Sequence, residues 1–298
     1  MNVGKAMRAA TDAKILITGA TGNVGGELAK VLSQRGIRFR AMVRTAGRAR
    51  TLASLPGIEL VNADFDDGET LARALKGVER AFLLTASSER AEAQQRAFVN
   101  AARQEGVRHV VKLSQWAADR DSPVRFLRYH AVVEQHVRDL GIGYTFLRPN
   151  LFFQGLLAVA GPISAEGRLY APIGDAAVSA VDVRDIADVA AITLTEPGHE
   201  GATYTLTGPA SITHAQIAAA LTAALGRDVT FVDVPPQAFA DSLRGILPPW
   251  QVEGLLEDYA HYRRGEAASV SPAVAEITGR PPRDVQQFAR DYAPAFSS

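Results

Sequence analysis

The sequence predicts an α/β protein in which a doubly wound parallel sheet is followed by a smaller, mostly helical C-terminal lobe. Three observations predict this fold class. Short β-branched runs alternate with longer helical patterns over the first half of the chain, which is typical of a parallel sheet with right-handed crossovers. A glycine-rich turn joins the first of these runs directly to the first helical pattern. After Gly208 the helical patterns dominate.

The expected elements follow in chain order. We expect strands at 14–18, 38–44, 59–63, 80–85, 109–113, 144–147 and 203–207. Helices are expected at 23–34, 91–104, 124–140, 181–194, 213–225, 237–244 and 251–261. Residues 151–170 are apolar with Gly and Pro interruptions, and we interpret them as an irregular connection. The tail carries one further candidate strand, 229–234, and no other sheet is expected there.

These elements divide the chain into two parts. The sheet domain comprises 13–150, and 178–207 returns to it. The smaller lobe comprises 151–177 and 208–298. Because a parallel sheet opens at the carboxyl ends of its strands, we expect the smaller lobe to lie over that edge.

Composition excludes several classes of protein. The 298 residues include no cysteine, 32 basic and 32 acidic residues, and 47% apolar residues. A zero net charge argues against general affinity for nucleic acid or an anionic membrane. No apolar run is long enough to span a bilayer, and no His spacing suggests a metal site. We therefore expect a cytoplasmic protein without a nucleic-acid, membrane or metal partner.

The turn after the first strand has the spacing GxxGxxG, from Gly19 to Gly25. The first glycine permits a tight turn, the second lets the backbone approach a pyrophosphate, and the third lets helix and strand pack closely. The helix N-terminus adds free N–H groups and a partial positive charge. In a βαβ context this pattern predicts a Rossmann domain that binds a dinucleotide. The expected contacts are Gly19, Thr21, Gly22, Asn23 and Val24.

The end of the second strand selects between the two nicotinamide dinucleotides. An NAD site usually places an acid there to hold the ribose hydroxyls, but no acid occurs between Gly36 and Pro56. Arg44 and Arg48 occupy this region instead, and a guanidinium can bind a 2′-phosphate. We therefore predict NADP(H) as the cofactor, with two solvated surface arginines as the alternative.

Two further strand ends provide candidate cofactor contacts. Asp64 can accept the adenine amino group with Phe65 beside the ring, or it can instead cap a helix that begins near Glu69. Thr85 and Ala86 end the fourth strand, where small residues leave room for a cofactor to cross the sheet edge.

The glycine motif, Val43-Arg44, Ala63-Asp64 and the stretch from Tyr129-His130 to Leu147-Arg148-Pro149-Asn150 resemble the NmrA-like family of atypical short-chain dehydrogenases/reductases. The likeness extends over nearly the whole chain and is strongest to the NADPH–quinone oxidoreductase and triphenylmethane reductase branch. It implies a Rossmann fold, a small C-terminal lobe and a cleft between them. It does not fix a reaction, because the family contains both enzymes and cofactor-binding sensors.

The resemblance also bears on the catalytic group. The superfamily's Tyr-xxx-Lys pair is absent, because Val133 stands four residues after Tyr129. Isoflavone-reductase-like members carry a lysine where this chain has His130, and the quinone-oxidoreductase-like branch has histidine there. We therefore predict His130 as general acid or substrate-orienting residue, since imidazole titrates near neutral pH. Glu134, one turn later, is expected to hold its other ring nitrogen; a surface histidine without a role is the alternative.

The remaining candidates follow the fifth and sixth strands. Ser114 and Pro149 are expected near the cofactor, and Lys112 either reaches it or is a simple strand-edge lysine. The expected substrate pocket consists of Trp116, Asn150, Phe152 and Phe153, with core packing as the alternative for the three aromatic residues. By contrast, Asp182 is expected to cap a helix, with Arg184 and Asp185 securing the junction between the lobes. The five histidines other than His130 lack partners at ligand spacing and are expected to be structural.

Together these features predict an NADPH-dependent reductase that transfers hydride to a quinone-like or other electron-poor aromatic or carbonyl acceptor. A small-molecule substrate is implied, and a homodimer is compatible with the sequence. The alternative is a non-catalytic NADP(H)-binding redox sensor or regulator, and a scaffold with a vestigial site is a third hypothesis.

Overall fold

The computed structural model describes residues 14–45 and 49–297. Within them, a sheet of seven strands has the order β3-β2-β1-β4-β5-β6-β9, and all neighbouring strands are parallel. The strands are β1 (Ile15–Ile17), β2 (Phe39–Val43), β3 (Ile58–Asn62), β4 (Arg80–Leu83), β5 (His109–Leu113), β6 (Gly143–Pro149) and β9 (Ala202–Leu206). The predicted doubly wound parallel sheet is confirmed.

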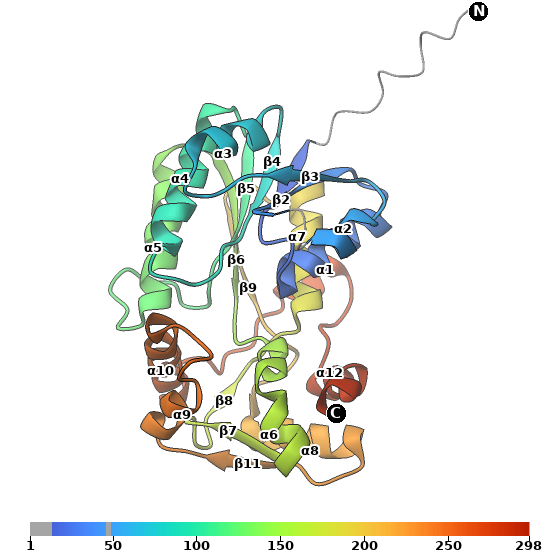
Figure 1. The fold of residues 1–298 in the computed structure, drawn as a ribbon, viewed down its shortest axis with the longest axis vertical. Helices are drawn as coiled ribbons and strands as arrows, with labels where there is room; N and C mark the ends of the chain where they lie inside the picture. The colour runs from blue at the N-terminus through green and yellow to red at the C-terminus, as the bar shows by residue number, and fades with distance from the viewer. Residues whose placement is uncertain (1–13, 46–48, 298) are drawn as a thin grey trace, which may run out of the picture.

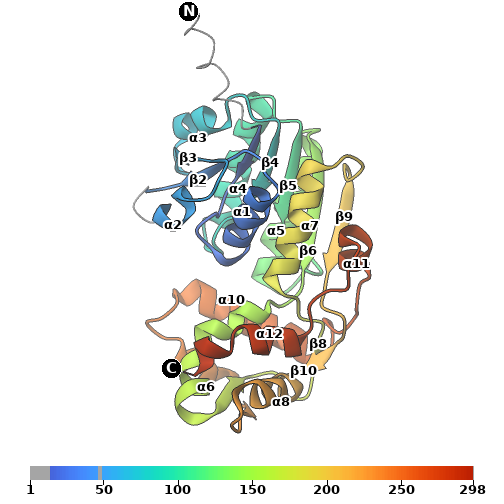
Figure 2. The same cartoon turned by 90° about the vertical axis from the view of Figure 1, so that its right-hand side faces the viewer.

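Helices cover both faces of this sheet (Figure 1 and Figure 2). One face carries α1 (Asn23–Gln34) and α7 (Val183–Thr195), and the other carries α3 (Gly68–Leu75), α4 (Ala91–Gln104) and α5 (Arg125–Asp139). A short helix, α2 (Arg50–Ala53), precedes β3. Ile15 and Ile17 join the core beneath α1 and α7, whereas Leu16 joins the core beneath α4, because successive side chains of a strand point to opposite faces.

The strand order reverses beside β1. Strands β2 and β3 lie on one side of β1, and β4, β5, β6 and β9 lie on the other. The connections on the two sides therefore diverge at the carboxyl ends of β1 and β4, and this leaves the crevice where open α/β sheets bind ligands.

The smaller lobe lies below the carboxyl edge of the sheet in Figure 1. Its elements are η2 (Phe153–Val159), α6 (Ala160–Glu166), β7 (Arg168–Ala171), β8 (Ala177–Val178), β10 (Ile212–Thr213), α8 (His214–Leu225), β11 (Thr230–Asp233), α9 (Pro236–Ser242), α10 (Pro249–Arg263), α12 (Val285–Asp291) and η3 (Ala293–Phe296). Phe153, Leu221 and Phe288 are among the residues of its core. Another helix, α11 (Ala273–Thr278), packs against α7 and β9 of the large sheet.

The lobe contains more β-structure than the sequence predicts. The predicted strand at 229–234 is confirmed as β11, which pairs in parallel with β7. Strands β8 and β10 form a second, antiparallel pair. The expectation of an irregular connection at 151–170 was wrong, because this segment contains η2, α6 and most of β7. These strands have two to four residues, too few for a periodic pattern to reveal them.

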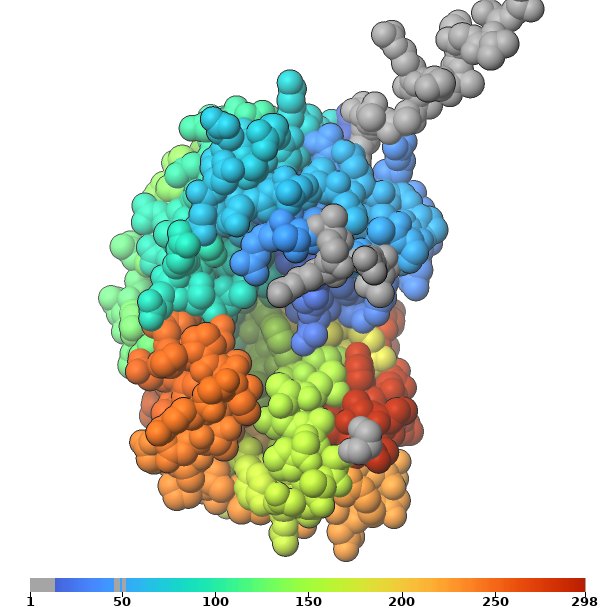
Figure 3. Space-filling view, viewed as in Figure 1, coloured from blue at the N-terminus to red at the C-terminus, as the bar shows by residue number. Residues whose placement is uncertain are grey.

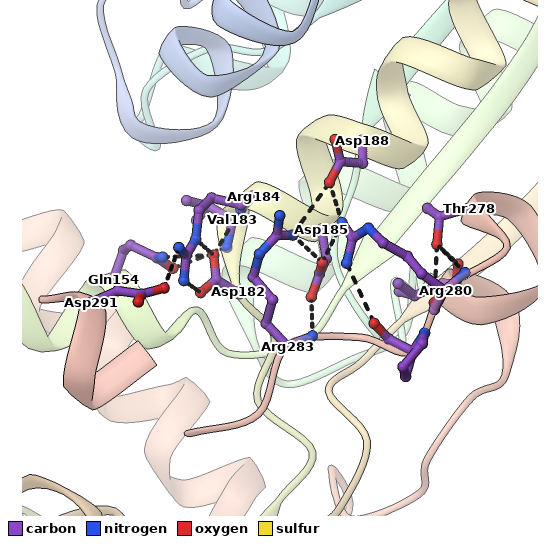
Figure 4. Close-up of polar contacts among 12 residues, drawn as sticks. Gln154, Asp182, Val183, Arg184, Asp185, Asp188, Thr278, Arg280, Arg283 and Asp291 are labelled. Atoms are coloured by element: carbon purple, nitrogen blue, oxygen red, sulfur yellow. Dashed lines mark hydrogen bonds and ion pairs between the residues drawn. The ribbon is translucent and has the colours of Figure 1, made fainter. Parts of the chain in front are cut away.

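An ionic cluster joins the two parts (Figure 4). Asp182 caps α7 by accepting a hydrogen bond from the Arg184 backbone N–H at 2.9 Å, and the Arg184 guanidinium reaches Asp291 of α12 at 2.6 Å. Asp185 is fully buried and binds the guanidinium groups of Arg280 and Arg283. The predicted cap and junction are both confirmed.

Helix α10 closes the other side of the carboxyl edge. The Gln115 amide donates to both carboxylate oxygens of Asp258 at 3.1 Å, and the Gln251 amide donates to the Ser87 carbonyl just after β4. Figure 3 shows a hollow between the blue segments above, the orange segment of α9 and α10, and the yellow-green segment of η2 and α6. The strand ends therefore face a cleft between the sheet and the smaller lobe.

Candidate functional site

The glycine turn presents exposed backbone at the start of α1. The Gly22 N–H donates to the Gly19 carbonyl at 2.9 Å, and Gly19 has φ +66°, which favours glycine. Thr21, Gly22 and Asn23 are exposed, whereas Val24 is 3% exposed, so its side chain belongs to the core. Within the described residues, no side chain caps α1 and its first turn holds no acid. The helix N-terminus is therefore free to bind an anion.

The third glycine of the motif is required by close packing. A Cβ atom on Gly25 would lie 2.3 Å from the Gly19 carbonyl oxygen, so any side chain there would displace the turn. A Cβ atom on Gly26 would meet only the Ala20 carbonyl oxygen, at 3.5 Å. The motif thus fixes the turn against the helix at one position and tolerates substitution at the next.

The residues predicted to recognise the adenosine half are found at the ends of β2 and β3. Arg44 directly follows β2 and is exposed. Arg48 lies outside the described residues. Asp64 is half-buried and accepts the Asp66 backbone N–H at 3.0 Å. The alternative that Asp64 caps the next helix was wrong, because the cap of α3 is Asp67.

At the end of β4, Thr85 and Ala86 differ in their environment. Thr85 is 9% exposed, and its hydroxyl accepts the Gln95 amide at 2.8 Å. Ala86 is exposed. The chain surface available to a ligand at this strand end is therefore the backbone and methyl group of Ala86, with the Thr85 hydroxyl behind it.

His130 lies in the first half of α5 and is 8% exposed. Its Nδ1 atom is 2.7 Å from the Nζ atom of Lys112, and its ring lies 4.2 Å from the Tyr129 ring, centroid to centroid. In the described part of the chain, no protein group forms a hydrogen bond with Nε2. One ring nitrogen is therefore held by the protein and the other is free for a ligand.

Lys112 is not the strand-edge lysine that the sequence suggested. It is fully buried in β5, in the interior of the sheet, where its ammonium or amine donates to the Leu113 carbonyl at 3.1 Å as well as to His130. Burial lowers the pKa of Lys112 to about 7; the Glu134 carboxylate opposes this shift, and Arg148 adds to it.

The electrostatics of His130 also differ from the expectation. Burial, followed by the charges of Lys112 and Arg148, holds the pKa of His130 well below its usual value. The imidazole is therefore neutral near pH 7. A simple imidazolium acid, the role that the sequence suggested, is disfavoured at this position.

Glu134 does not hold the imidazole, and that expectation was wrong. It is fully buried and accepts the Ser114 hydroxyl at 2.6 Å and two guanidinium N–H groups of Arg148 at 2.9 and 2.6 Å. The reason is that the neighbouring strands β5 and β6 supply stronger donors than a ring nitrogen. Since the Ser114 hydroxyl donates its proton to Glu134, its oxygen can act toward any further partner only as an acceptor.

The residues predicted to line the substrate pocket are spread over several environments. Trp116 is half-buried, with its indole N–H 3.3 Å from the Glu266 carbonyl. Asn150 is 4% exposed, and its amide donates to the Ser179 hydroxyl and the Ala267 carbonyl, both at 2.9 Å. Asn150 thus ties the end of β6 to the smaller lobe. Pro149, at the end of β6, accepts the Trp116 backbone N–H at 2.8 Å.

The two adjacent phenylalanines also separate. Phe152 packs against the core beneath α7. Phe153 is 2% exposed and stacks on Phe288, with ring centroids 5.4 Å apart. The structure therefore places Phe153 in the core of the smaller lobe, as in the packing alternative.

Sequence reasoning missed the partner of Gln115. Asp258 is 5% exposed, and burial raises its pKa to about 7, against the effect of the Gln115 hydrogen bond. The two residues are 143 positions apart, so no local signal connects them. Ala117, two residues after Gln115, has φ +54°, a backbone conformation that non-glycine residues rarely adopt and that often marks functional sites.

Two further findings concern the described residues, 14–45 and 49–297. No three His, Cys, Asp or Glu side chains there are grouped as metal ligands. None of the helices in those ranges combines the length and the apolar character that crossing a bilayer requires.

The chain is similar to known proteins over most of its length. The model of the NmrA-like family matches residues 11–278. The NAD(P)H azoreductase of Xenophilus azovorans is 36% identical over 285 residues, which cover 95% of this chain and 99% of that protein. An Escherichia coli NADPH-dependent quinone oxidoreductase, solved with NADPH, has a TM-score of 0.84 and 30% identity, and the match covers 92% of this chain and 98% of that one.

A third similar protein is the triphenylmethane reductase of Citrobacter sp., solved with NADP(H). It has a TM-score of 0.83 and 26% identity, and the match covers 94% of this chain and 99% of that one. The agreement extends through both the sheet and the smaller lobe. From its glycine turn, its strand order and these matches, the chain belongs to the NmrA-like family.

Proposed function

We propose that the protein is an NADPH-dependent reductase that transfers hydride to a quinone-like or other electron-poor acceptor. The observation that carries this proposal is the uncapped N-terminus of α1 beside the exposed Arg44 at the end of β2. The first feature suits a pyrophosphate and the second suits a 2′-phosphate. The names of similar proteins support both the cofactor and the reaction class.

Under this proposal, the residues predicted from the sequence would contact the cofactor along its length. Gly19, Thr21, Gly22, Asn23 and Val24 would hold the pyrophosphate through backbone N–H groups. The adenosine half would lie against Arg44, Arg48, Asp64 and Phe65, and the nicotinamide half against Thr85, Ala86, Ser114 and Pro149. When bound, NADPH supplies the hydride. The protein's task is then to hold the two reacting rings together and to exclude water.

Two observations support this class of acceptor. The site lacks the acid pair used for carbonyl reduction, and the names of similar proteins include a quinone oxidoreductase and an azoreductase. The Tyr-xxx-Lys pair that serves carbonyl reduction is missing, and the pKa of Tyr129 is raised to about 12 by burial, so its phenol is a poor acid. An acceptor whose reduced form is weakly basic needs little acid assistance. Quinones meet this condition, and His130, whose Nε2 makes no hydrogen bond to the described residues, is the group that would orient them, with Trp116 as the aromatic residue predicted to line the pocket.

Titration with the two cofactors tests the proposal. We expect NADPH to bind more tightly than NADH. Arg44→Ala should reduce the binding free energy of NADPH by about 1.5–3 kcal/mol, because a charge-assisted hydrogen bond is lost, while the affinity for NADH changes little. Arg73→Ala is the matched control, because Arg73 is exposed on α3. Equal or tighter binding of NADH in the unmodified protein would contradict the proposal.

Turnover separates the reductase from a sensor. Purified protein is assayed for NADPH oxidation with menadione and with an azo dye, and His130→Ala is expected to lower kcat while leaving NADPH affinity unchanged. His136→Ala, on the same helix, is the control and should match the unmodified protein. Tight NADPH binding without turnover of quinone, azo dye, aldehyde or enone would instead indicate a redox sensor. A homodimer and a cytoplasmic location stay predictions from the sequence.

A further inference from the structure

We propose that Lys112 acts through His130 as a proton source, so that the neutral imidazole passes a proton to the reduced acceptor while it receives one from the buried amine. The inference rests on the proposed reductase function and deepens it. It assigns a role to a lysine inside the sheet whose side chain reaches no solvent.

The geometry couples the two side chains directly. Nζ of Lys112 lies 2.7 Å from Nδ1 of His130 and 3.1 Å from the Leu113 carbonyl oxygen. An ammonium group has no lone pair, so Nδ1 must be the acceptor while Lys112 is charged. The ring proton is then on Nε2, the nitrogen that makes no hydrogen bond to the described part of the chain.

The surrounding charges leave the Lys112 proton available. Glu134 of α5 faces this pair but is engaged by Arg148 of β6, by Arg138 and by the Ser114 hydroxyl. Among the described residues no carboxylate lies within 4.0 Å of Nζ. With burial and the Arg148 charge, this places the pKa of Lys112 at about 7, so that both protonation states are populated near neutral pH.

The proposed step balances without an imidazolium. The Nε2–H bond breaks as the new O–H or N–H bond forms on the reduced acceptor, and an Nζ–H bond breaks as Nδ1–H forms. The ammonium becomes a neutral amine, and the imidazole stays neutral with its proton on the other nitrogen. In the return step, a water molecule gives a proton to Nε2 and leaves as hydroxide, while Nδ1–H passes its proton to the Nζ lone pair in the same event, and the starting state is restored. The charged imidazole, which burial and two cations disfavour, is never needed.

The first test needs no substrate. The full-length protein is labelled with ¹⁵N-histidine, and the His130 signals are assigned with His130→Gln. We expect the Nε2–H tautomer below pH 7 and a chemical-shift step near pH 7 without imidazolium formation, as Lys112 titrates. Lys112→Met should remove the step, and Lys76→Met, at an exposed position after α3, should keep it. Imidazolium formation near pH 6–7, or an unchanged step in Lys112→Met, would overturn the proposal.

A second variant separates positioning from proton supply. The amide of Lys112→Gln can donate to Nδ1 but has no proton to give up, so the Nε2–H tautomer should persist while the step near pH 7 disappears. This variant also serves if Lys112→Met does not fold. A step that survives in both variants would show that another group titrates.

The rate test uses two acceptors that differ in their need for a proton. With an azo dye, whose reduced nitrogen is strongly basic, both variants should lower kcat at least tenfold at unchanged KM for NADPH. With menadione the loss should be several-fold smaller. Equal kcat in Lys112→Gln and the unmodified protein would overturn the relay. Failure of the unmodified protein to oxidise NADPH would instead contradict the proposed function, and the NMR result would still decide the coupling of Lys112 to His130.

Discussion

At the scale of single residues, the site depends on buried polar groups that satisfy one another across elements. Glu134 has no exposed surface, and it accepts from Ser114 after β5 and from Arg148 of β6. A buried carboxylate of this kind is stable only while its donors remain. Arg138 of α5 itself is a further partner. Because Ser114 and Arg148 belong to the end of β5 and to β6, the contacts that neutralise the charge also fix the end of the sheet beside His130.

Glu134→Gln should therefore destabilise the fold. The change removes the negative charge and leaves Arg148 without its partner, and breaking a buried pair costs about 3 kcal/mol at the low end of the usual range. We use the low end of the range because the Arg148 side chain is 24% exposed, so water can partly solvate its charge once Glu134 is neutral. The free energy of unfolding is measured in urea, with Glu92→Gln as control. Glu92 forms an exposed pair with Arg96 on one helix, where about 0.5 kcal/mol is expected; equal losses at both positions would contradict the argument.

At the scale of elements, the junction of β1 and α1 joins packing to ligand binding. The helix starts at Asn23 after an extended Gly22, and the turn brings the Gly19 carbonyl against Gly25. This close contact holds α1 against the sheet, and the turn leaves the first N–H groups of α1 exposed. Any change that lifts the helix should therefore affect stability and cofactor affinity together.

Gly25→Ala and Gly26→Ala form a matched pair at this junction. Gly25→Ala places a Cβ atom 2.3 Å from the Gly19 carbonyl oxygen. Gly26→Ala places it 3.5 Å from the Ala20 carbonyl oxygen, which is an ordinary van der Waals contact. Gly25→Ala should lower stability and NADPH affinity together, whereas Gly26→Ala should be neutral or stabilise by about 0.5–1 kcal/mol through helix propensity. Calorimetry of unfolding and NADPH titration measure both effects. Normal NADPH affinity in Gly25→Ala would show that the turn has more freedom than this packing allows.

At the scale of the whole molecule, the cleft exists because two sets of contacts hold the lobes together. On one side, Asp185 of α7 binds Arg280 and Arg283, as Figure 4 shows. On the other, Asp258 of α10 receives the Gln115 amide from the end of β5. Both carboxylates are buried. Asp185 pairs with two guanidinium groups, whereas among residues 14–45 and 49–297 no cation forms an ion pair with Asp258. The two sides should thus respond differently to substitution and to pH.

Asp185→Asn should loosen the first side. Two guanidinium groups and the Arg283 backbone N–H, which donates to Asp185 at 2.7 Å, lose a charged acceptor, and a loss of about 3 kcal/mol is expected. Proteolysis within 279–284 should become faster at the same time, because this segment is held by Asp185. Asp139→Asn, at an exposed position at the end of α5, is the control. Unchanged stability and cleavage in Asp185→Asn would exclude this role.

Asp258 should make stability depend on pH. Its folded-state pKa of about 7 lies above the ordinary value of 3.8, so between these values the folded state binds more protons than the unfolded state. Stability is then greatest at low pH and falls as pH rises from about 4 to 7. Relative to Asp258→Asn, the unmodified protein should lose on the order of 2 kcal/mol between pH 5 and 8. Urea unfolding at both pH values measures this, and parallel pH profiles would rule out the buried acid as its source.

The sequence by itself determined whatever depends on neighbours along the chain. The helix predicted at 23–34 is α1, the one predicted at 91–104 is α4, and the cap by Asp182 is present, because periodicity and capping are local. The tertiary structure alone decided the pairing of β7 with β11, the Lys112–His130 contact and the burial of Asp258 against Gln115. These join residues 18 to 143 positions apart, and their partners and pKa values depend on which surfaces the packed sheet and lobe exclude from water.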